Sequence, residues 1–412
     1  MSALVNWSEK IERRLIHSAI WPILLAGFAG SAAIFMFLVH VVAVRVLSTA
    51  EYGEFSSAVA LVGIIGVGAT SVQAVTVKQL KNPNARSGSL LEPMAEVGVL
   101  FVATTAVGVV SHVAMRVSMT TSILLALWVP SAVLLARANG YVQARELQVL
   151  LNGVTALSNV GALAATCMVA ALSAGVAQLL LGRLIVTIAT AILLLVAVRD
   201  RSTSRNGFVS LDLVSSTLIV SAMWFAANLD VLLGRALLDR EDVGQIAVAA
   251  MLVNSVLLMP GLIAAVVYPK VVAHSLEPGH LRRLLVNSVL LAGVLQIGFA
   301  LCLRMTSGWL VDWLAGSDHD VAKAVIFPLA LAYIPLGMCI VLTQFVLAIG
   351  RFVDSFTYVL LVCLAALGMT TATESAQHFV SVLNASAWFL TAGLTVQVLF
   401  RLRGVHAQAQ SV

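Results

Sequence analysis

Long apolar runs, separated by short polar stretches, repeat along the whole chain. Each run is long enough, as a helix, to cross the roughly 30 Å hydrocarbon core of a bilayer. The pattern predicts twelve transmembrane helices with short connections. We place them at residues 19–44, 55–77, 93–113, 119–138, 150–172, 176–198, 213–234, 244–269, 284–303, 324–349, 352–372 and 379–400.

The first run follows a short basic segment and is too long for the apolar region of a cleaved signal peptide. We therefore interpret it as a retained first helix. Residues 1–18 are expected to be an interfacial segment, because Leu4, Trp7, Ile11 and Leu15 fall three to four positions apart and would share one helix face. A frayed terminus is the alternative.

Composition agrees with a membrane protein and excludes a soluble globular one. Hydrophobic residues make up 60% of the 412 residues, charged residues 10%, and the mean hydropathy is +1.01; ordinary soluble domains carry about 25% charged residues. The four cysteines all lie within apolar runs without a C-x-x-C spacing, so they indicate neither a zinc site nor a disulfide framework. The predicted fold class is all-α and polytopic.

Basic residues fall mainly on one side of the predicted topology. With the N-terminus inside, 17 of the 24 Lys and Arg lie in cytoplasmic segments, which by the positive-inside rule places both termini in the cytoplasm of a cell with this protein in its plasma membrane. The net charge of +5 is then an orientation signal facing anionic lipid. Nucleic-acid binding is not needed to explain it.

The two halves of the chain resemble each other when they are offset by about 191 residues. The segment from Val42 toward Lys78 matches the segment from Val231 toward Lys270, so the first two helices correspond to the seventh and eighth. Six helices separate the copies, so both have the same membrane orientation. The repeat predicts two pseudo-symmetric six-helix lobes, an N-lobe at 19–200 and a C-lobe at 201–403, around a central cleft, with a tail at 404–412. The matched pairs include Arg45 with Arg235, and Gly53 with Gly244.

Two segments carry a resemblance to a known family. The first helix ends in R-x-L and is followed by the residues EYG, from Arg45 to Gly53; the seventh and eighth helices contain Asn228, Asp230 and a Tyr268-Pro269 pair. In these features the chain resembles the polysaccharide flippases of the multidrug/oligosaccharidyl-lipid/polysaccharide exporter superfamily. The glycine of the second copy is followed by Gln245, where tyrosine is the more usual residue.

The resemblance implies a flippase that works by alternating access. Its substrate would be a polyprenyl-diphosphate-linked oligosaccharide, moved from the cytoplasmic to the outer leaflet for cell-surface polysaccharide assembly. A sugar-diphosphate head cannot enter hydrocarbon uncompensated, whereas the prenyl tail is stable there. A polar, cationic cleft is therefore expected, and arginine suits it because its planar fork can bond two phosphate oxygens.

Candidate substrate-binding residues are Arg183, Arg45, Arg235 and Asn228. Arg183 lies about seven residues inside the sixth run, where a charge usually faces protein or water; snorkelling to the interface is its alternative. Arg45 and Arg235 are related by the repeat and would flank the cleft mouth, or mark where helices leave the membrane. Asp230 is the candidate ion-coupling residue for a proton or sodium ion, with an Asp230–Arg235 ion pair as the alternative.

Other functional classes remain open on the sequence alone. An ion-coupled multidrug or cation antiporter of the same superfamily would be expected to carry more buried acids. A membrane-embedded polymerase or glycosyltransferase would need large outer loops, and the longest outer connection, about Arg304 to Lys323, is short. Asp312, Asp318, His319 and Asp320 in that connection are interpreted as a solvated loop, without a metal. We expect a monomeric transporter that is not an enzyme and needs no cofactor, with lipid-linked oligosaccharide and membrane lipids as its partners.

Overall fold

The computed structural model describes residues 20–81, 91–145, 147–172, 175–198, 211–274, 277–350 and 352–409. Among these residues every regular element is helical and no strand occurs. The expected interfacial segment at 1–18 lies outside the described residues.

Each of the twelve predicted spans corresponds to one helix or to two or three consecutive helices. The helices are α2 (Ile20–Val46), α3 (Thr49–Lys81), α4 (Leu91–Val113), α5 (Met119–Ala144), α6 (Gln148–Ala171), α7 (Val176–Val198), α8 (Leu211–Ala227), α9 (Leu229–Leu237), α10 (Arg240–Val253), η2 (Asn254–Leu257), α11 (Leu258–Ala273), α12 (Pro278–Leu314), α13 (Asp320–Ile349), α14 (Phe352–Gly368), η3 (Met369–Thr371) and α15 (Ala376–Ala409).

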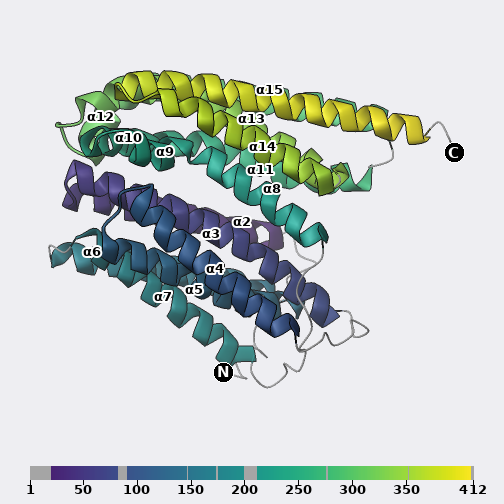
Figure 1. The fold of residues 1–412 in the computed structure, drawn as a ribbon, viewed down its shortest axis with the longest axis horizontal. Helices are drawn as coiled ribbons and strands as arrows, with labels where there is room; N and C mark the ends of the chain where they lie inside the picture. The colour runs from purple at the N-terminus through teal and green to yellow at the C-terminus, as the bar shows by residue number, and fades with distance from the viewer. Residues whose placement is uncertain are drawn as a thin grey trace. The chain divides into compact units, whose positions relative to one another are not determined.

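The chain divides into two compact units, each with its own set of packed helices (Figure 1). Unit 1 contains Met1–Ser48 and Leu61–Ser210. Within it α5 packs against α4 and α7, while α2 packs against α6. A small buried cluster of Ala138, Val142, Leu147 and Leu194 joins α5, the start of α6 and the end of α7.

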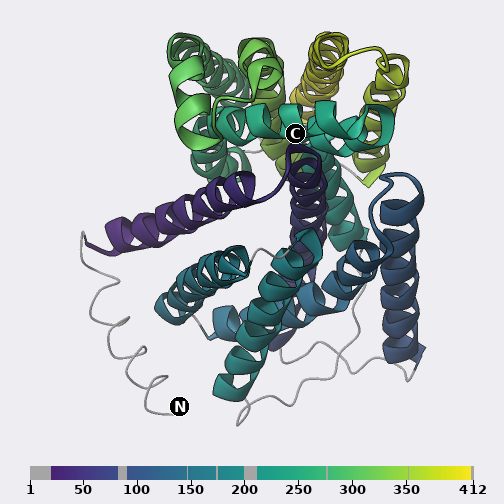
Figure 2. The same cartoon turned by 90° about the vertical axis from the view of Figure 1, so that its left-hand side faces the viewer.

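Unit 2 contains Thr49–Ala60 and Leu211–Val412, so the first residues of α3 group with the second half of the chain. Its central element is α13, which packs against α10, α11, α12 and α15. Figure 2 shows α12, α13, α14 and α15, coloured from green to yellow, side by side and almost end-on. Because α13 is covered on several sides, most of its side chains are buried, and it forms the core of unit 2.

Nine helical segments in the described residues are long and apolar enough to cross a membrane, or ten if the bent pair α8 and α9 counts as one span. The described apolar parts of α2 and α4, Ala33–Val46 and Leu100–Val113, are shorter. With these two, the described helices account for all twelve sequence-predicted spans. The chain is a multi-pass membrane protein with an all-α fold.

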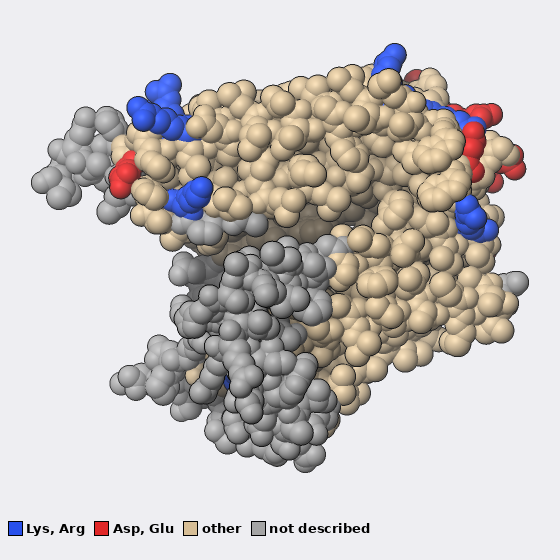
Figure 3. All heavy atoms as spheres, turned by 180° about the vertical axis from the view of Figure 1, so that it is seen from behind, with Lys and Arg blue, Asp and Glu red and all other residues tan. Residues whose placement is uncertain are grey.

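Charged side chains gather at the ends of the unit 2 helices. On the face shown in Figure 3, blue and red residues lie at the two ends of these helices, near the top of the view, and the band between them is tan. An uncharged band with charged ends is the distribution that a bilayer selects, because a charge at its centre is costly.

The structure corrects two details of the predicted helices. The seventh span is not continuous: α8 and α9 meet at Asn228 with a bend of 66°. The ninth helix does not end near residue 303 but continues to Leu314, so the connection before α13 runs only from Ala315 to His319. Helical hydrogen bonds continue beyond the apolar run because polar residues such as Arg304 and Asp312 are tolerated where the helix leaves the hydrocarbon.

Candidate functional site

The bend between α8 and α9 places Asp230 in the first turn of α9. Asp230 is buried, with 2% of its surface exposed, and its carboxylate accepts a hydrogen bond of 2.7 Å from the hydroxyl of Tyr333 on α13. The first turn of a helix favours a negative charge because its backbone N–H groups lack partners. A buried acid is therefore held by a helix start on one side and by a phenol on the other.

Tyr333, the hydrogen-bond partner of Asp230, is itself held in place by a residue of α12. The side-chain amide of Gln296 is fully buried and donates to the backbone carbonyl of Tyr333 at 2.9 Å. Gly337 provides the space for this amide, because a Cβ at that position would overlap it. Gln296 and Tyr333 thus link α12, α13 and α9 through consecutive hydrogen bonds.

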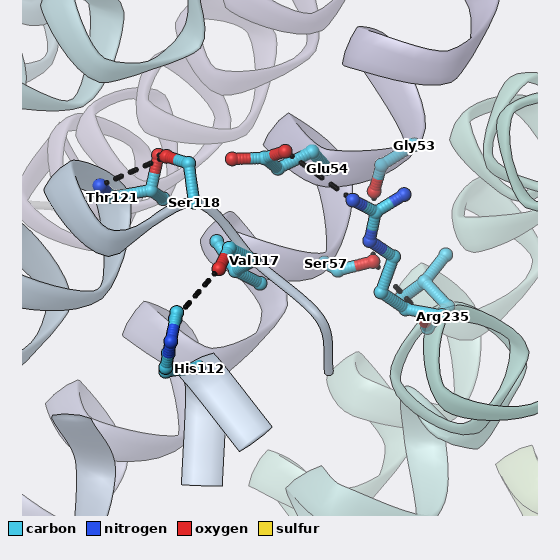
Figure 4. A network of polar contacts seen from close by, with 9 residues as sticks. Gly53, Glu54, Ser57, His112, Val117, Ser118, Thr121 and Arg235 are labelled. Atoms are coloured by element: carbon cyan, nitrogen blue, oxygen red, sulfur yellow. Dashed lines mark hydrogen bonds and ion pairs between the residues drawn. The ribbon is translucent and has the colours of Figure 1, made fainter. Parts of the chain in front are cut away.

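Arg235 lies five positions after Asp230 and has a different partner. It is buried, with 3% exposed, and its guanidinium forms an ion pair of 3.3 Å with Glu54 in the second turn of α3. Ser57, one turn further along α3, donates to the carbonyl of Val231 at 2.9 Å. Figure 4 shows the Arg235 side chain directed toward Glu54, with Ser57 beside it. These contacts fasten the start of α3 to α9.

Two glycines allow the start of α3 to approach α10 closely. A Cβ on Gly53 would lie 2.9 Å from the backbone nitrogen of Gly244, and a Cβ on Gly244 would overlap the backbone carbonyl of Thr49. Gly53 and Gly244 are the glycines that the sequence repeat aligned with each other. Equivalent positions of the two copies therefore meet, and only residues without a side chain fit there.

Arg183 lies in α7 of unit 1, within the membrane-spanning segment. Its side chain reaches α2, where one terminal nitrogen (NH2) lies 3.4 Å from the sulfur of Met36. The other terminal nitrogen (NH1) is buried and has no hydrogen-bond partner among the described residues. His40 on α2 interacts electrostatically with this guanidinium. The charge therefore lies against the neighbouring helix rather than extending along α7 to the membrane surface.

The structure places the remaining predicted residues in different surroundings. Asn228 is the residue between α8 and α9, and its side-chain amide donates to the Trp224 carbonyl at 2.8 Å. Arg45 is exposed in the last turn of α2, although its repeat counterpart Arg235 is buried. Asp230, Asn228 and Arg235 lie together in unit 2, whereas Arg45 and Arg183 belong to unit 1.

Tyr333, Glu54 and Gln296 are parts of this network that the sequence did not single out. Tyr333 is a polar aromatic residue inside a long apolar helix, between Pro328 and Pro335, and that position was the available signal. Glu54 stands beside Gly53 in the segment that carried the resemblance. A single sequence could not connect either residue to its partner, since the partners lie 103 and 181 positions away.

The acids that were interpreted as a solvated cluster lie around the connection before α13: Asp312 in the last turn of α12, Asp318 in the connection and Asp320 at the start of α13. Lys323 bridges two of them, at 2.7 Å from Asp312 and 3.2 Å from Asp320. His319 is buried at 7% exposed, whereas Asp318 and Asp320 are exposed. The carboxylates of Asp312 and Asp320 thus have a cationic partner from the chain itself.

A further ion pair lies at the ends of α14 and α15. The Nε of Arg401 approaches both carboxylate oxygens of Asp354, at 2.9 and 2.7 Å, and Gln397 donates to the Asp354 carbonyl at 2.9 Å. The pair borders a groove of about 490 Å³ between the two helices, whose apolar lining includes Val396 and Phe400. Neither residue of this pair was predicted from the sequence.

No protein-family model matches the chain, and no curated protein matches it. Solved structures do match over nearly its whole length. The lipid II flippase MurJ in an inward closed conformation aligns with a TM-score of 0.65 and 13% identity, covering 94% of this chain and 91% of that one. An inward-facing multidrug resistance MATE family transporter of the MOP superfamily aligns at 0.62 with 12% identity, covering 92% and 94%. A eukaryotic MATE transporter aligns at 0.57 with 14% identity, covering 93% and 98%.

These similarities define the class of the protein by its fold. It is an all-helical, multi-pass membrane protein with two helical units. More specifically, the chain shares its fold with the lipid II flippase MurJ and with these MATE transporters, in agreement with the fold that the resemblance in its sequence implied.

Proposed function

We propose that this chain is a membrane transporter that flips a polyprenyl-diphosphate-linked oligosaccharide from the cytoplasmic to the outer leaflet by alternating access. The fold supports a transporter, since a flippase and several multidrug transporters share it. Among the matched structures, the lipid II flippase has the same kind of task as the one proposed here.

The observation that carries the proposal is the environment of Arg183. A guanidinium inside a membrane-spanning segment is costly in free energy unless something compensates it, and one of its buried nitrogens has no partner in the described part of the chain. A diphosphate would supply that compensation, because its oxygens accept the paired bonds that a guanidinium donates. A cationic drug would instead be repelled from this position.

Replacement of Arg183 tests the assignment. Arg183→Gln should reduce transport of a labelled prenyl-diphosphate sugar in proteoliposomes by about tenfold or more, since a hydrogen bond to a charged group contributes about 1.5–3 kcal/mol. Transport by Arg183→Lys should lie between that of the wild type and that of Arg183→Gln. Lysine keeps the positive charge but lacks the planar guanidinium that can bond two phosphate oxygens at once. Protein abundance in the membrane should stay at the wild-type level in both variants.

Arg304→Gln is the matched control. Arg304 also lies in a membrane-spanning helix, but it is exposed and stacks over the Phe327 ring at 4.6 Å. Its replacement should leave transport unchanged. Wild-type transport by Arg183→Gln, or an equal loss in Arg304→Gln, would remove the support for a diphosphate site at Arg183.

An ion-coupled antiporter is the second candidate, and Asp230 is the observation in its favour. A buried carboxylate bonded to Tyr333 is a group that can take up and release a proton or hold a sodium ion. Under this alternative Asp230→Asn should abolish ion-driven efflux of cationic drugs, while Arg183→Gln should not affect it. If the chain is a flippase, Arg183→Gln should impair transport of the lipid-linked substrate more than Asp230→Asn does. Asp230→Asn should then change only how that transport depends on the ion gradient.

A further inference from the structure

Two histidines and a glutamate converge where α11 passes into α12. His274 follows α11, Glu277 precedes α12, and His280 lies in the first turn of α12. One ligand atom from each side chain lies within 4.8 Å of the other two, and the two imidazole rings stack with centroids 4.2 Å apart. We propose that these three side chains bind a divalent first-row transition-metal ion of the zinc type.

The orientation of His274 fits a metal ligand. Its Nδ1 lies 3.0 Å from the backbone carbonyl of Lys270, an acceptor. The hydrogen bond therefore requires the proton on Nδ1 and leaves the lone pair on Nε2 for an ion. Histidines that bind metals almost always make such a bond to a carbonyl or carboxylate through the second nitrogen.

Among the described residues, the Glu277 carboxylate is not used to cap the helix that follows it. Glu277 occupies the N-cap position of α12, but its side chain makes no capping hydrogen bond. Pro278 follows as the first helical residue and has no N–H to be capped. The backbone N–H of Glu277 donates to the His274 carbonyl at 2.9 Å, which closes the turn and holds these two residues close together.

The donor set selects the class of ion. Two imidazoles with one carboxylate suit zinc, nickel, copper or iron, whereas magnesium and calcium prefer ligands that are all oxygen. Bonds of about 2.0–2.2 Å place the ligand atoms of a tetrahedral site about 3.3 Å apart. His280 and Glu277 are exposed and His274 is half-buried, so their side chains have room to rotate. To hold one ion, the stacked imidazole rings would tilt so that a nitrogen lone pair of each points at it. Water would complete the coordination.

Binding would join two helices of unit 2. His274 belongs to the end of α11 and His280 to the start of α12, and these helices pack against each other. An ion held by both would fix the angle of the turn between them. Because Gln296 of α12 holds Tyr333, the same helix that the ion anchors also supports the partner of Asp230. The site is distinct from the transport residues, and its existence does not depend on the proposed function.

Zinc binding to the purified full-length protein, after removal of any histidine tag, tests the proposal. Competition between the protein and a zinc-sensitive dye should give one site per chain. His280→Ala should weaken that site by at least about tenfold, since even the loss of a residue supporting a ligand typically costs 10–100-fold. Glu277→Gln should also weaken it while preserving the size and shape of the side chain.

His112→Ala is the matched control. His112 is exposed, and its Nδ1 also contacts a backbone carbonyl, that of Val117 at 3.1 Å, but it is not part of a group of potential ligands among the described residues. This variant should bind zinc as the wild type does. Equal zinc affinity in wild type and His280→Ala, or no binding by a wild-type protein that elutes as a single folded species, would overturn the proposal.

Discussion

At the scale of single residues, the two arginines related by the repeat have different surroundings. Arg45 is exposed at the end of α2, whereas Arg235 is buried and paired with Glu54. The sequence identified both arginines and Asp230 by their positions at helix ends, but it paired Asp230 with Arg235 as an alternative. The structure pairs Asp230 with Tyr333 and Arg235 with Glu54, because the bend at Asn228 turns the α9 side chains toward different helices.

Removing one member of the Arg235–Glu54 pair should destabilise the protein strongly. Arg235→Gln is expected to lower the free energy of unfolding in detergent by about 3–5 kcal/mol, because the remaining charge is poorly solvated. In a double-mutant cycle, Arg235→Gln with Glu54→Gln should cost less than the sum of the two single changes.

An exposed ion pair provides the comparison. Asp320→Asn removes one carboxylate partner of Lys323, where the Asp320 side chain is 91% exposed. The expected cost is below about 1 kcal/mol. If Arg235→Gln were as mild as Asp320→Asn, the buried pair would not contribute to holding α3 against α9.

The close approach at Gly244 makes a second residue-scale prediction. Gly244→Ala should destabilise the protein by about 1–3 kcal/mol, because its Cβ would overlap the Thr49 backbone and force α10 away from α3. Thermal unfolding in detergent measures this effect. Gly261→Ala on α11 is the control, since nothing lies within 4 Å of its Cβ; there alanine should be neutral or stabilising by up to about 1 kcal/mol.

At the scale of elements, hydropathy predicted where helices lie better than how they end or bend. The apolar runs determined the spans because only helices and closed barrels satisfy backbone hydrogen bonds in lipid. The break between α8 and α9 gave no such signal, since neither proline nor glycine stands at Asn228. The amide of Asn228 bonds back to the Trp224 carbonyl and replaces part of the interrupted helical ladder. That local compensation is visible only in three dimensions.

Helix starts outside the apolar band depend on ordinary capping. Ser118 precedes α5, and its hydroxyl accepts from the backbone N–H of Thr121 at 3.2 Å (Figure 4). Ser118→Ala should lower the free energy of unfolding by about 1 kcal/mol, whereas Ser118→Asp should keep the cap. Equal stability of the alanine and aspartate variants would contradict a capping role for Ser118.

At the scale of the whole molecule, the apolar spans predicted an all-α, multi-pass fold, and the matched structures have such a fold. The lobe boundary at 200/201 and the cleft remain predictions. Thr49–Ala60 belongs to the unit formed by the second half of the chain. This exchange could not be predicted from one sequence, because hydropathy does not indicate which helices touch. The metal ligands were likewise missed, since only the turn between α11 and α12 brings His274 and His280 together.

The membrane orientation is the prediction that belongs to this scale. In a background without native cysteines, Ser317→Cys should react with a membrane-impermeant maleimide added outside intact cells, because its connection is expected on the outer side. Ala273→Cys should react only after permeabilisation. Both positions are exposed in the structure, so the reverse labelling pattern would reverse the topology inferred from the basic residues.

The contact of Gly53 with Gly244 has a consequence for the origin of the fold. Each glycine is the counterpart of the other in the repeat, and a residue that meets its own counterpart is the signature of an isologous interface between identical subunits. A chain of half this length could form the same contact by pairing with a second copy of itself. Gene duplication and fusion would then retain this contact inside one polypeptide, while each copy remained free to acquire its own neighbours, as Arg45 and Arg235 have done.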